Sequence, residues 1–567
     1  MKKSRTLLIC FLLTAGMACS IFASAAVTGE KIVDNSRSIE AALLEEDWDY
    51  VTMQQASPNS GQYDTFFPYL SNLSAYIKER RPNATQVFHM TWAYQADSNH
   101  SGFANYGRDQ MTMYNAIVTA STRAAAQAGI SVILPSGVAW QKARATAVGD
   151  TLCRDGYHGN AKGQYLASAV WYEMLSGHSI LDNEYVPAQN DGAPVIDETT
   201  LEILKQCAHE AVEEYRQGEA VPVDAVKVLA IGNSFSDDAA TYISQMAMAD
   251  NVAFKLGKLY IGGCSLATHW KNASENNAAY VYTKFDLDRD TREGVYYFAD
   301  LAYESSLTPS FYYQVDQSPM SRLLQFPATG AGASITFTVP DVPAGQYSLS
   351  ISSRDFTTRG RYQVSVNGAH VGEVDFYGQS GNRTHDAGTV TIGQTGDVEL
   401  TLTVIGKYNS ATGFGAFLNT ITFTPHQLSY DMPYQTADGR LWGIEDTDLT
   451  AFLDGFTLGA GTQVKVLDGE AEVTAGRIGT GMTVQILFEG SVKEEYTAVV
   501  YGDIVGDGRI NSADLLMLKR RVLELAALDG AQELAANADR DVLNAVNSAD
   551  LMAVKRAILK LQKIHQK

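Results

Sequence analysis

Three residues in this chain have the side chains that hydrolysis by a serine nucleophile requires. Ser234 lies in the run VKVLAIGNSFSDD (226–238), where an apolar stretch leads into a Gly-Asn-Ser turn. Asp155 and His158 lie three residues apart in the run RDGYH (154–158). A hydroxyl nucleophile needs a base to take its proton and a third group to orient that base. The pattern therefore predicts Ser234 as nucleophile, His158 as base and Asp155 as the orienting carboxylate.

The position of Ser234 also suits the stabilisation of an oxyanion. Gly232 and Asn233 permit a tight turn between a predicted strand, Val226–Ile231, and the start of a predicted helix. The first amides of a helix have no partner within the helix and can bind an anion. Loss of one such donor typically lowers turnover by about 10²–10³-fold. A lone Gly-x-Ser is weak evidence, because a serine at this position also caps a helix.

These motifs together resemble those of SGNH (GDSL-like) esterases over about residues 27–286. GNSFS (232–236) resembles the nucleophile block and RDGYH the Asp-x-x-His block. YIGGCSL (260–266) resembles the glycine block, which implies that the backbone amide of Gly263 is an oxyanion donor. MQQAS (53–57) stands where the family usually has Gly-x-Asn-Asp, so Gln55 (or Gln54) would have to supply the third donor. The runs EEDWDYVTMQQAS and HMTWAYQ are similar to a bacterial branch of SGNH-like proteins.

The order of the blocks differs from that of the family. There the serine block opens the domain and the Asp-x-x-His block closes it, whereas here Asp155 and His158 precede Ser234. A circular permutation explains this order, because only the short link Glu219–Ala225 joins the last helix to the serine strand. The new ends, near Val27 and 284–286, are predicted to be surface loops, where permutation is tolerated. A broken, inactive domain and a swapped dimer are the alternatives.

The elements around these motifs alternate between strand and helix, which predicts a three-layer α/β domain. Strands are predicted at 50–54, 86–91, 130–134, 226–231 and 255–261, and helices at 66–79, 109–126, 161–175, 200–217 and 238–249. Such alternation is typical of a doubly wound parallel sheet, and the SGNH resemblance implies its flavodoxin-like form. His89 and His100 are expected to be structural or rim residues, since no metalloenzyme spacing accompanies them.

Beyond about residue 295 the apolar period changes to two. Alternating runs with an Asn-Gly turn at 367–368 predict an antiparallel β-sandwich over 295–426. The stretch resembles carbohydrate-binding jelly-roll modules, in which sugars stack on aromatic rings. The candidate sugar contacts are Tyr362, Phe376, Tyr377 and Tyr408. Residues 428–500 are predicted to form a small β-rich spacer module.

The final segment is a repeat with two acidic loops. NSADLLMLKRRVL (511–523) recurs as NSADLMAVKRAIL (547–559). The loops 503–514 and 539–550 place oxygen-bearing side chains at the offsets that calcium requires. The predicted ligands are Asp503, Asp507, Asn511 and Asp514 in the first loop, and Asp539, Asp541, Asn547 and Asp550 in the second. The unit resembles a type I dockerin over 501–567, which implies a cohesin partner recognised through Ser512-Ala513 and Ser548-Ala549.

Both loops depart from the dockerin pattern. Val505 and Leu543 stand at ligand positions, and Asn544 replaces the usual glycine. Fewer oxygen ligands predict weaker calcium binding, especially in the second loop.

The composition indicates a secreted, multidomain protein. Residues 1–25 combine basic residues, an apolar stretch and Ala23-Ser24-Ala25, which is typical of a secretory signal. No later stretch has the roughly 20 apolar residues of a membrane span. A net charge of −21 disfavours nucleic-acid binding. Outside the signal, Cys153, Cys207 and Cys264 form an odd set, for which free thiols are expected.

These observations lead to one main functional hypothesis. The chain is predicted to be a secreted, modular SGNH-type carbohydrate esterase that removes ester groups, with acetyl the expected one, from plant polysaccharides. Its dockerin would recruit it to a cohesin scaffold, with structural calcium and no catalytic cofactor. One alternative is a non-catalytic, carbohydrate-binding cellulosomal component with an inactive SGNH-like domain. Another is an acyl hydrolase whose substrate is not a carbohydrate.

Overall fold

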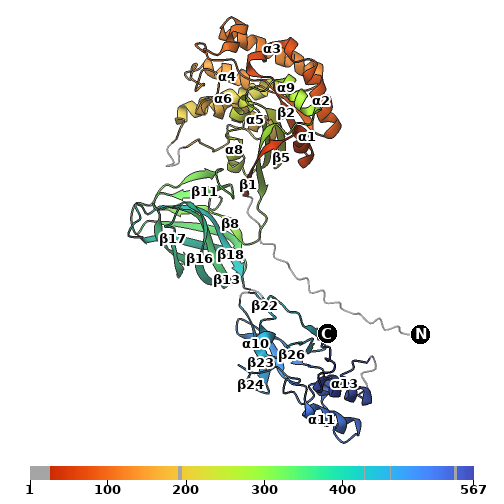
Figure 1. Cartoon of the computed structure of the whole chain (residues 1–567). Helices are drawn as coiled ribbons and strands as arrows, with labels where there is room; N and C mark the ends of the chain where they lie inside the picture. Colours follow the sequence, from red (N-terminus) through yellow and green to blue (C-terminus); the bar gives the residue numbers. More distant parts are fainter. Residues whose placement is uncertain (1–25, 189–193, 427, 460, 542–545) are drawn as a thin grey trace, which may run out of the picture. The chain divides into compact units, whose positions relative to one another are not determined.

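The computed structural model describes residues 26–188, 194–426, 428–459, 461–541 and 546–567, which form two compact units. The first unit contains residues up to 424 except 345–347, and the second contains those three residues and 425–567 (Figure 1). The predicted signal, residues 1–25, and the positions Leu543 and Asn544 lie outside the described residues. Within the described ranges, no helix is both long and apolar enough to cross a membrane.

A seven-stranded sheet forms the centre of the α/β domain. Its order is β1-β7-β6-β5-β2-β3-β4. The pairs β6–β5, β5–β2, β2–β3 and β3–β4 are parallel, whereas β7 and β1 are antiparallel to their neighbours. The strands are β1 Val27–Arg37, β2 Tyr50–Met53, β3 Thr85–His89, β4 Val132–Leu134, β5 Ala225–Gly232, β6 Ala253–Tyr260 and β7 Tyr280–Arg289.

Helices connect successive parallel strands and pack in two groups. Helices α4, α5 and α6 contact one another, and α2 contacts α1 and α9. The helices are α1 Ile39–Glu45, α2 Tyr69–Arg80, α3 Gln110–Ala128, α4 Ser136–Arg144, α5 Ala161–Ser176, α6 Glu198–Tyr215, α7 Ser234–Ala239, α8 Ile243–Ala249 and α9 Leu266–Ser274, with 3₁₀ turns η1 Ser57–Asn59, η2 Tyr63–Thr65 and η3 Ser101–Tyr106. The parallel sheet and its crossover helices are therefore present as predicted.

Two local predictions for this domain are wrong. The segments near Val27 and 284–286 are not surface loops, because they lie in β1 and β7, which pair with each other. Lys284 is only 4% exposed at its side chain and forms ion pairs with acidic side chains that include Glu46 at 2.7 Å. The single helix predicted at 238–249 is two helices, α7 and α8, since the backbone N–H of Tyr242 donates to Ser168 Oγ instead of continuing the helix.

The β-sandwich consists of two antiparallel sheets. One has the order β10-β11-β18-β13-β16, with β8 paired to β18, and the other β15-β14-β17-β12-β9. The strands are β8 Val295–Tyr297, β9 Ala302–Ser305, β10 Ser310–Gln314, β11 Ser321–Phe326, β12 Ser334–Val342, β13 Gly345–Asp355, β14 Gly360–Val366, β15 Ala369–Asp375, β16 Gly381–Ile392, β17 Gly396–Lys407 and β18 Ala416–Pro425. Asn367 and Gly368 both have positive φ, as the predicted hairpin turn between β14 and β15 requires.

The four aromatic candidates for sugar contact divide into two classes. Tyr362 and Phe376 are fully buried and pack on each other in the core, so the prediction that they contact sugar is wrong. Tyr362 points inward because side chains alternate along β14, and Phe376 directly follows the end of β15. Tyr377 and Tyr408 instead stack on each other with centroids 4.7 Å apart, and Tyr408 is 54% exposed. This pair alone keeps the predicted role among the four.

The second unit joins the small β-rich module to the repeat. The module has a sheet of order β20-β21-β26-β25-β23-β24 and a separate pair β19–β22. Its elements are β19 Tyr430–Asp431, β20 Gln435–Ala437, β21 Arg440–Trp442, α10 Leu449–Leu453, β22 Thr457–Leu458, β23 Thr462–Asp468, β24 Ala471–Glu472, β25 Thr483–Phe488 and β26 Ser491–Ala498. In the repeat, α11 Ser512–Val522 packs against α13 Ser548–Ile558, with α12 Gly530–Ala536 between them in sequence.

Candidate active site

Ser234 is the first residue of α7, directly after β5. Asn233 caps the helix, because its side-chain oxygen accepts the backbone N–H of Phe235 at 3.1 Å. The same oxygen accepts Gln54 Nε2 at 2.6 Å, and Asn233 Nδ2 donates to the carbonyl of Cys264 at 3.0 Å. The turn before the serine is therefore tied to the ends of two neighbouring segments, which fixes the direction of the Ser234 side chain.

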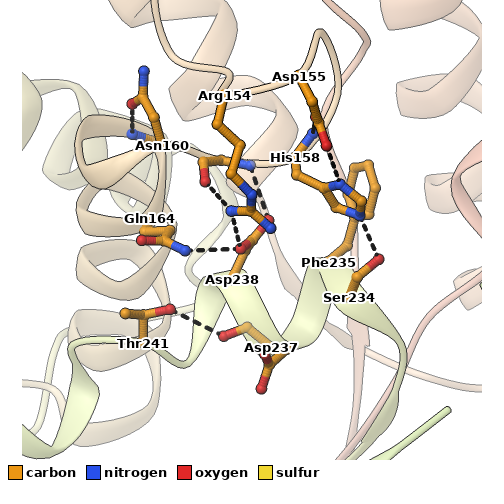
Figure 2. A network of polar contacts seen from close by, with 12 residues as sticks. Arg154, Asp155, His158, Asn160, Gln164, Ser234, Phe235, Asp237, Asp238 and Thr241 are labelled. Atoms are coloured by element: carbon orange, nitrogen blue, oxygen red, sulfur yellow. Dashed lines mark hydrogen bonds and ion pairs between the residues drawn. The ribbon is translucent and has the colours of Figure 1, made fainter. Parts of the chain in front are cut away.

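Ser234, His158 and Asp155 form one chain of hydrogen bonds (Figure 2). Ser234 Oγ lies 2.8 Å from His158 Nε2, and His158 Nδ1 lies 2.7 Å from Asp155 Oδ2. The residues that sequence reasoning grouped, 76 positions apart for serine and histidine, thus meet within a single chain. With the proton on Nδ1 donated to the carboxylate, Nε2 is free to accept the serine proton.

The carboxylate of Asp155 is held in its charged form. Partial burial works against ionisation, but hydrogen bonds from the His158 ring and from the backbone N–H groups of His158 and Tyr157 keep the pKa of Asp155 below its ordinary value. The two backbone bonds go to Oδ1, at 2.8 Å from His158 and 3.2 Å from Tyr157. Oδ2 is left for the imidazole, which the carboxylate therefore orients.

Two backbone amides, those of Ser234 and Gly263, are candidates to bind an oxyanion. Among the described residues, neither the N–H of Ser234 nor that of Gly263 donates to another group. Gly263 has φ +64° and open space where a side chain would stand. The loop that contains it is anchored by the Asn233–Cys264 bond. The arrangement places a free amide on each of the two segments predicted to supply one.

Gln55 does not supply the predicted third donor in this structure. Its amide nitrogen donates to the carbonyl and the hydroxyl of Thr65, both at 3.1 Å. Its oxygen accepts the backbone N–H groups of Ala56 and Leu266. Gln54 is occupied as well, between Asn233 and His89. Both glutamines are buried, and their amide groups bond to neighbouring side chains and backbone, so they connect the segments around Ser234.

The histidines at 89 and 100 have the structural and rim positions expected. His89 is buried between Gln54 and Ser136, and burial lowers its pKa to about 3. The His100 ring contacts Tyr157 edge-on, and the Tyr157 ring in turn lies 4.1 Å from the His158 ring, centroid to centroid. Partial burial, and then the charge of His158, lower the pKa of His100. Aromatic side chains therefore border the His158 imidazole.

The sequence did not reveal the residues that join the segment 154–159, called the base loop because it contains His158, to α7, called the serine helix because it begins with Ser234. Asp238, on α7, is 3% exposed and accepts hydrogen bonds from Arg154 and Gly159, on either side of the Asp155–His158 segment. The one available signal was the second acidic residue of the SFSDD run, which a sequence reading assigns to the solvated start of a helix.

The first acidic loop of the repeat has the geometry of a cation site. Asp503, Asp507 and Asp514 each offer a carboxylate oxygen, all within 4.8 Å of one another. Asp503 and Asp514 are fully buried, and burial above all raises the pKa of Asp503 to about 6. Three carboxylates this close together, two of them buried, suit a calcium ion, which these three residues would hold.

The asparagines and the second loop are arranged differently. The side-chain oxygens of Asn511 and Asn547 cap α11 and α13. Asp550 is buried and accepts the backbone N–H of Asp539, but the described part of loop two gives no group of three carboxylates as close as in loop one. The predicted ligands Asp539, Asp541 and Asn547 stay a prediction.

The free thiols agree with the expected absence of a disulfide framework. Cys153, Cys207 and Cys264 are all unpaired with one another. Burial raises the pKa of Cys153 and Cys264 to about 12, so neither is a ready nucleophile.

Comparison with known proteins assigns two families. A family described as "domain of unknown function (DUF4886)" matches residues 18–211 and 227–305, and the type I dockerin family matches 501–559. The gap between the first two segments falls on the link from α6 to β5. A search of curated proteins finds no match.

Several solved structures are similar to parts of the chain. A DUF4886 family protein from Bacteroides uniformis is 40% identical, over 32% of this chain and 69% of that one, with a TM-score of 0.30. A CBM36 domain of a termite-hindgut xylanase is 11% identical over 24% of this chain and 97% of its own, with a TM-score of 0.19. A family 35 carbohydrate-binding module from Clostridium thermocellum is 17% identical over 22% and 95%, with a TM-score of 0.18.

The dockerin match has direct consequences. Type I dockerins bind calcium, imply a cohesin partner and indicate an extracellular cellulosome component. From its 40% identity to a protein that it covers over 69%, together with the matched segments, the chain belongs to the DUF4886 family and carries a type I dockerin domain.

Proposed function

We propose that the α/β domain is a serine esterase of the SGNH type, which removes acyl groups, acetyl first among them, from plant polysaccharides. The observation that carries this proposal is the hydrogen-bond chain Ser234–His158–Asp155, at 2.8 and 2.7 Å. A serine that merely caps a helix needs no imidazole on its hydroxyl, and an imidazole that is merely structural needs no serine. The free amides of Ser234 and Gly263 add the means to stabilise an oxyanion.

The reaction follows from the positions of these groups. Ser234 Oγ attacks the ester carbonyl while its proton moves to His158 Nε2, and Asp155 stabilises the resulting imidazolium. The carbonyl oxygen becomes an oxyanion held by the two backbone amides. When the tetrahedral intermediate collapses, His158 gives the proton to the leaving sugar hydroxyl, and the acyl group stays on Ser234. Water, activated by His158, then hydrolyses this acyl-enzyme and releases the carboxylic acid.

The polysaccharide substrate is inferred from the rest of the chain. A dockerin indicates attachment to a cellulosome, whose setting is plant cell-wall polysaccharide. In the stacked Tyr377–Tyr408 pair on the sandwich, Tyr408 is exposed and Tyr377 half-buried, and the pair offers a ring face on which a sugar can stack. The SGNH resemblance favours an ester over an amide as the bond that is cleaved. The wall formed by Tyr157 and His100 suits a sugar ring near the imidazole.

The first test compares purified protein with its Ser234→Ala variant on p-nitrophenyl acetate. Ser274→Ala is the matched control, because that serine is exposed on α9 and its hydroxyl donates only to the carbonyl of Lys271. We expect activity in the wild type and the control, and a loss of at least about 10³-fold in Ser234→Ala. Equal rates in all three proteins would eliminate the esterase and leave a non-catalytic cellulosomal protein.

The second test concerns the substrate. Acetate release from acetylated xylan is compared with hydrolysis of aryl and glyceryl acetates of the same acyl length. A preference for xylan by kcat/KM supports the carbohydrate esterase. A preference for the small esters assigns the domain to acyl hydrolases of other substrates.

The third test concerns the dockerin. Binding of the full chain to an immobilised type I cohesin is measured with calcium and with excess chelator. Asp503 and Asp514 are buried and repel each other when no calcium ion lies between them. We therefore expect binding to the cohesin to be weaker in the chelator. Unchanged binding would refute a calcium-organised dockerin.

A further inference from the structure

One buried carboxylate joins the two segments that carry the proposed catalytic residues. Asp238 lies one turn after Ser234 on α7 (Figure 2). Its Oδ1 accepts Arg154 Nη1 at 2.8 Å and Gln164 Nε2 at 2.9 Å. Its Oδ2 accepts the backbone N–H of Gly159 at 2.9 Å. All three donors belong to the segment 154–164, which contains Asp155 and His158.

The contacts of Asp238 enclose the base loop at both ends. Arg154 precedes Asp155, and Gly159 follows His158. The loop is also closed on itself, because the Arg154 backbone N–H donates to the His158 carbonyl at 2.9 Å and the Arg154 side chain donates to the Gly159 carbonyl. The loop is therefore a small preformed unit, and Asp238 supplies side-chain acceptors that attach this unit to the serine helix.

This attachment matters because the covalent chain provides none. Ser234 and His158 are 76 residues apart, and the segments that carry them are continuous only through α5, α6 and the link to β5. A hydrogen bond between a hydroxyl and an imidazole cannot by itself hold a loop in place. Charge-assisted hydrogen bonds to a buried carboxylate are directional and stronger than neutral ones, so Asp238 is suited to this task.

We propose that Asp238 is a positioning residue that sets the distance between His158 Nε2 and Ser234 Oγ. The inference rests on the proposed esterase function. Asp238 touches no reacting atom in this scheme. It acts through Arg154 and Gly159, which place the loop and thereby the imidazole.

The critical substitution is Asp238→Asn, which keeps the shape of the side chain. Both carboxylate oxygens of Asp238 accept hydrogen bonds. An asparagine must therefore turn its NH₂ group toward Gly159 N–H or toward Arg154 and Gln164, so a donor faces a donor on one side. Asp237→Asn is the matched control, since Asp237 lies on the same helix, loses the same charge and is 54% exposed in a pair with Lys258.

In esterase assays Asp238→Asn should lower kcat by about 10²-fold, the effect of a displacement near 1 Å, with KM changed less than about twofold. Asp237→Asn should stay within about twofold of the wild type. If Asp238→Asn does not fold, Arg154→Lys replaces it, because the lysine side chain is one bond shorter and its ammonium falls short of the position of Arg154 Nη1, which donates to both Asp238 and the Gly159 carbonyl. A kcat in the folded Asp238→Asn or Arg154→Lys protein equal to that of the wild type would overturn the proposal.

A spectroscopic readout separates this proposal from the proposed function. The ring-proton NMR signals of His158 report its hydrogen bond to Ser234, and the Ser234→Ala variant gives the reference spectrum for a missing bond. We expect the Asp238→Asn spectrum to move toward that reference and the Asp237→Asn spectrum to match the wild type. If no ester is cleaved by any protein, the esterase function fails, while the spectra still decide whether Asp238 sets the Ser234–His158 contact. A wild-type spectrum in Asp238→Asn would refute that role.

Discussion

Replacing Asp155 by asparagine tests how the base is oriented. In the structure Oδ1 of Asp155 accepts two backbone N–H groups, from Tyr157 and His158, and Oδ2 accepts His158 Nδ1. An asparagine has one oxygen only. The two backbone donors claim that oxygen, so the NH₂ group turns toward His158 Nδ1. The imidazole must then accept at Nδ1 and carry its proton on Nε2, where it can no longer take a proton from Ser234.

The size of the effect follows from this change of tautomer. In serine hydrolases an Asp-to-Asn change of this kind lowers kcat by about 10⁴-fold with the geometry intact. The side chain of Asp155 is 41% exposed, so water screens part of its charge and can partly replace it. We therefore expect a loss of about 10³–10⁴-fold in kcat, which corresponds to about 4–5.5 kcal/mol of transition-state stabilisation.

The assay is hydrolysis of p-nitrophenyl acetate from pH 5 to 10, with Asp109→Asn as the control. Asp109 caps α3 by accepting the Thr112 N–H, and asparagine caps a helix equally well. The control should keep wild-type activity, and thermal unfolding should show both variants folded. A loss of less than about tenfold in folded Asp155→Asn would refute the orientation argument, because the carboxylate would then not set the tautomer.

Three further predictions concern the modules outside the α/β domain. Gly479→Ala should destabilise the second unit by about 1–3 kcal/mol in denaturant unfolding, because its Cβ would lie 2.1 Å from a backbone oxygen of the first calcium loop. Gly530→Ala in the same unit, whose Cβ would meet only the end of the Arg440 side chain at 3.1 Å, should have a much smaller effect. In excess chelator the same unit should lose stability as the pH rises from about 4 to about 6, because burial raises the pKa of Asp503 to about 6 and the folded state therefore disfavours ionisation of this carboxyl and binds a proton in this range. Unfolding followed by circular dichroism measures this stability, and a stability that rises with pH would contradict the expected sign. Tyr408→Ala should weaken retention on insoluble xylan by about 2–10-fold, whereas the buried Tyr362→Phe should leave retention unchanged, and equal retention by Tyr408→Ala would remove the stacking surface.

Much of this protein was determined by short-range patterns in the sequence. The Gly-Asn-Ser turn, the Asp-x-x-His spacing and the repeated Asn-Ser-Ala-Asp starts of α11 and α13 each depend on residues within one turn of one another. The serine turn at the start of α7 and the starts of α11 and α13 are present as predicted, whereas Asn511 and Asn547, predicted as calcium ligands, cap their helices with their side-chain oxygens. Capping, tight turns and apolar periodicity act over a few residues, so one sequence is enough to find them.

Tertiary structure decided which of these pieces work together. The contact between Ser234 and His158 depends on β5 entering the sheet between β2 and β6, which no local pattern specifies. The use of Gln55 by Thr65 and Leu266, and the role of Asp238 as an acceptor for Arg154 and Gly159, arise because a buried polar atom must find whatever partner the fold brings near. Such pairings join residues that are distant in sequence, so only packing reveals that an expected donor is occupied and that an unremarked carboxylate holds the site together.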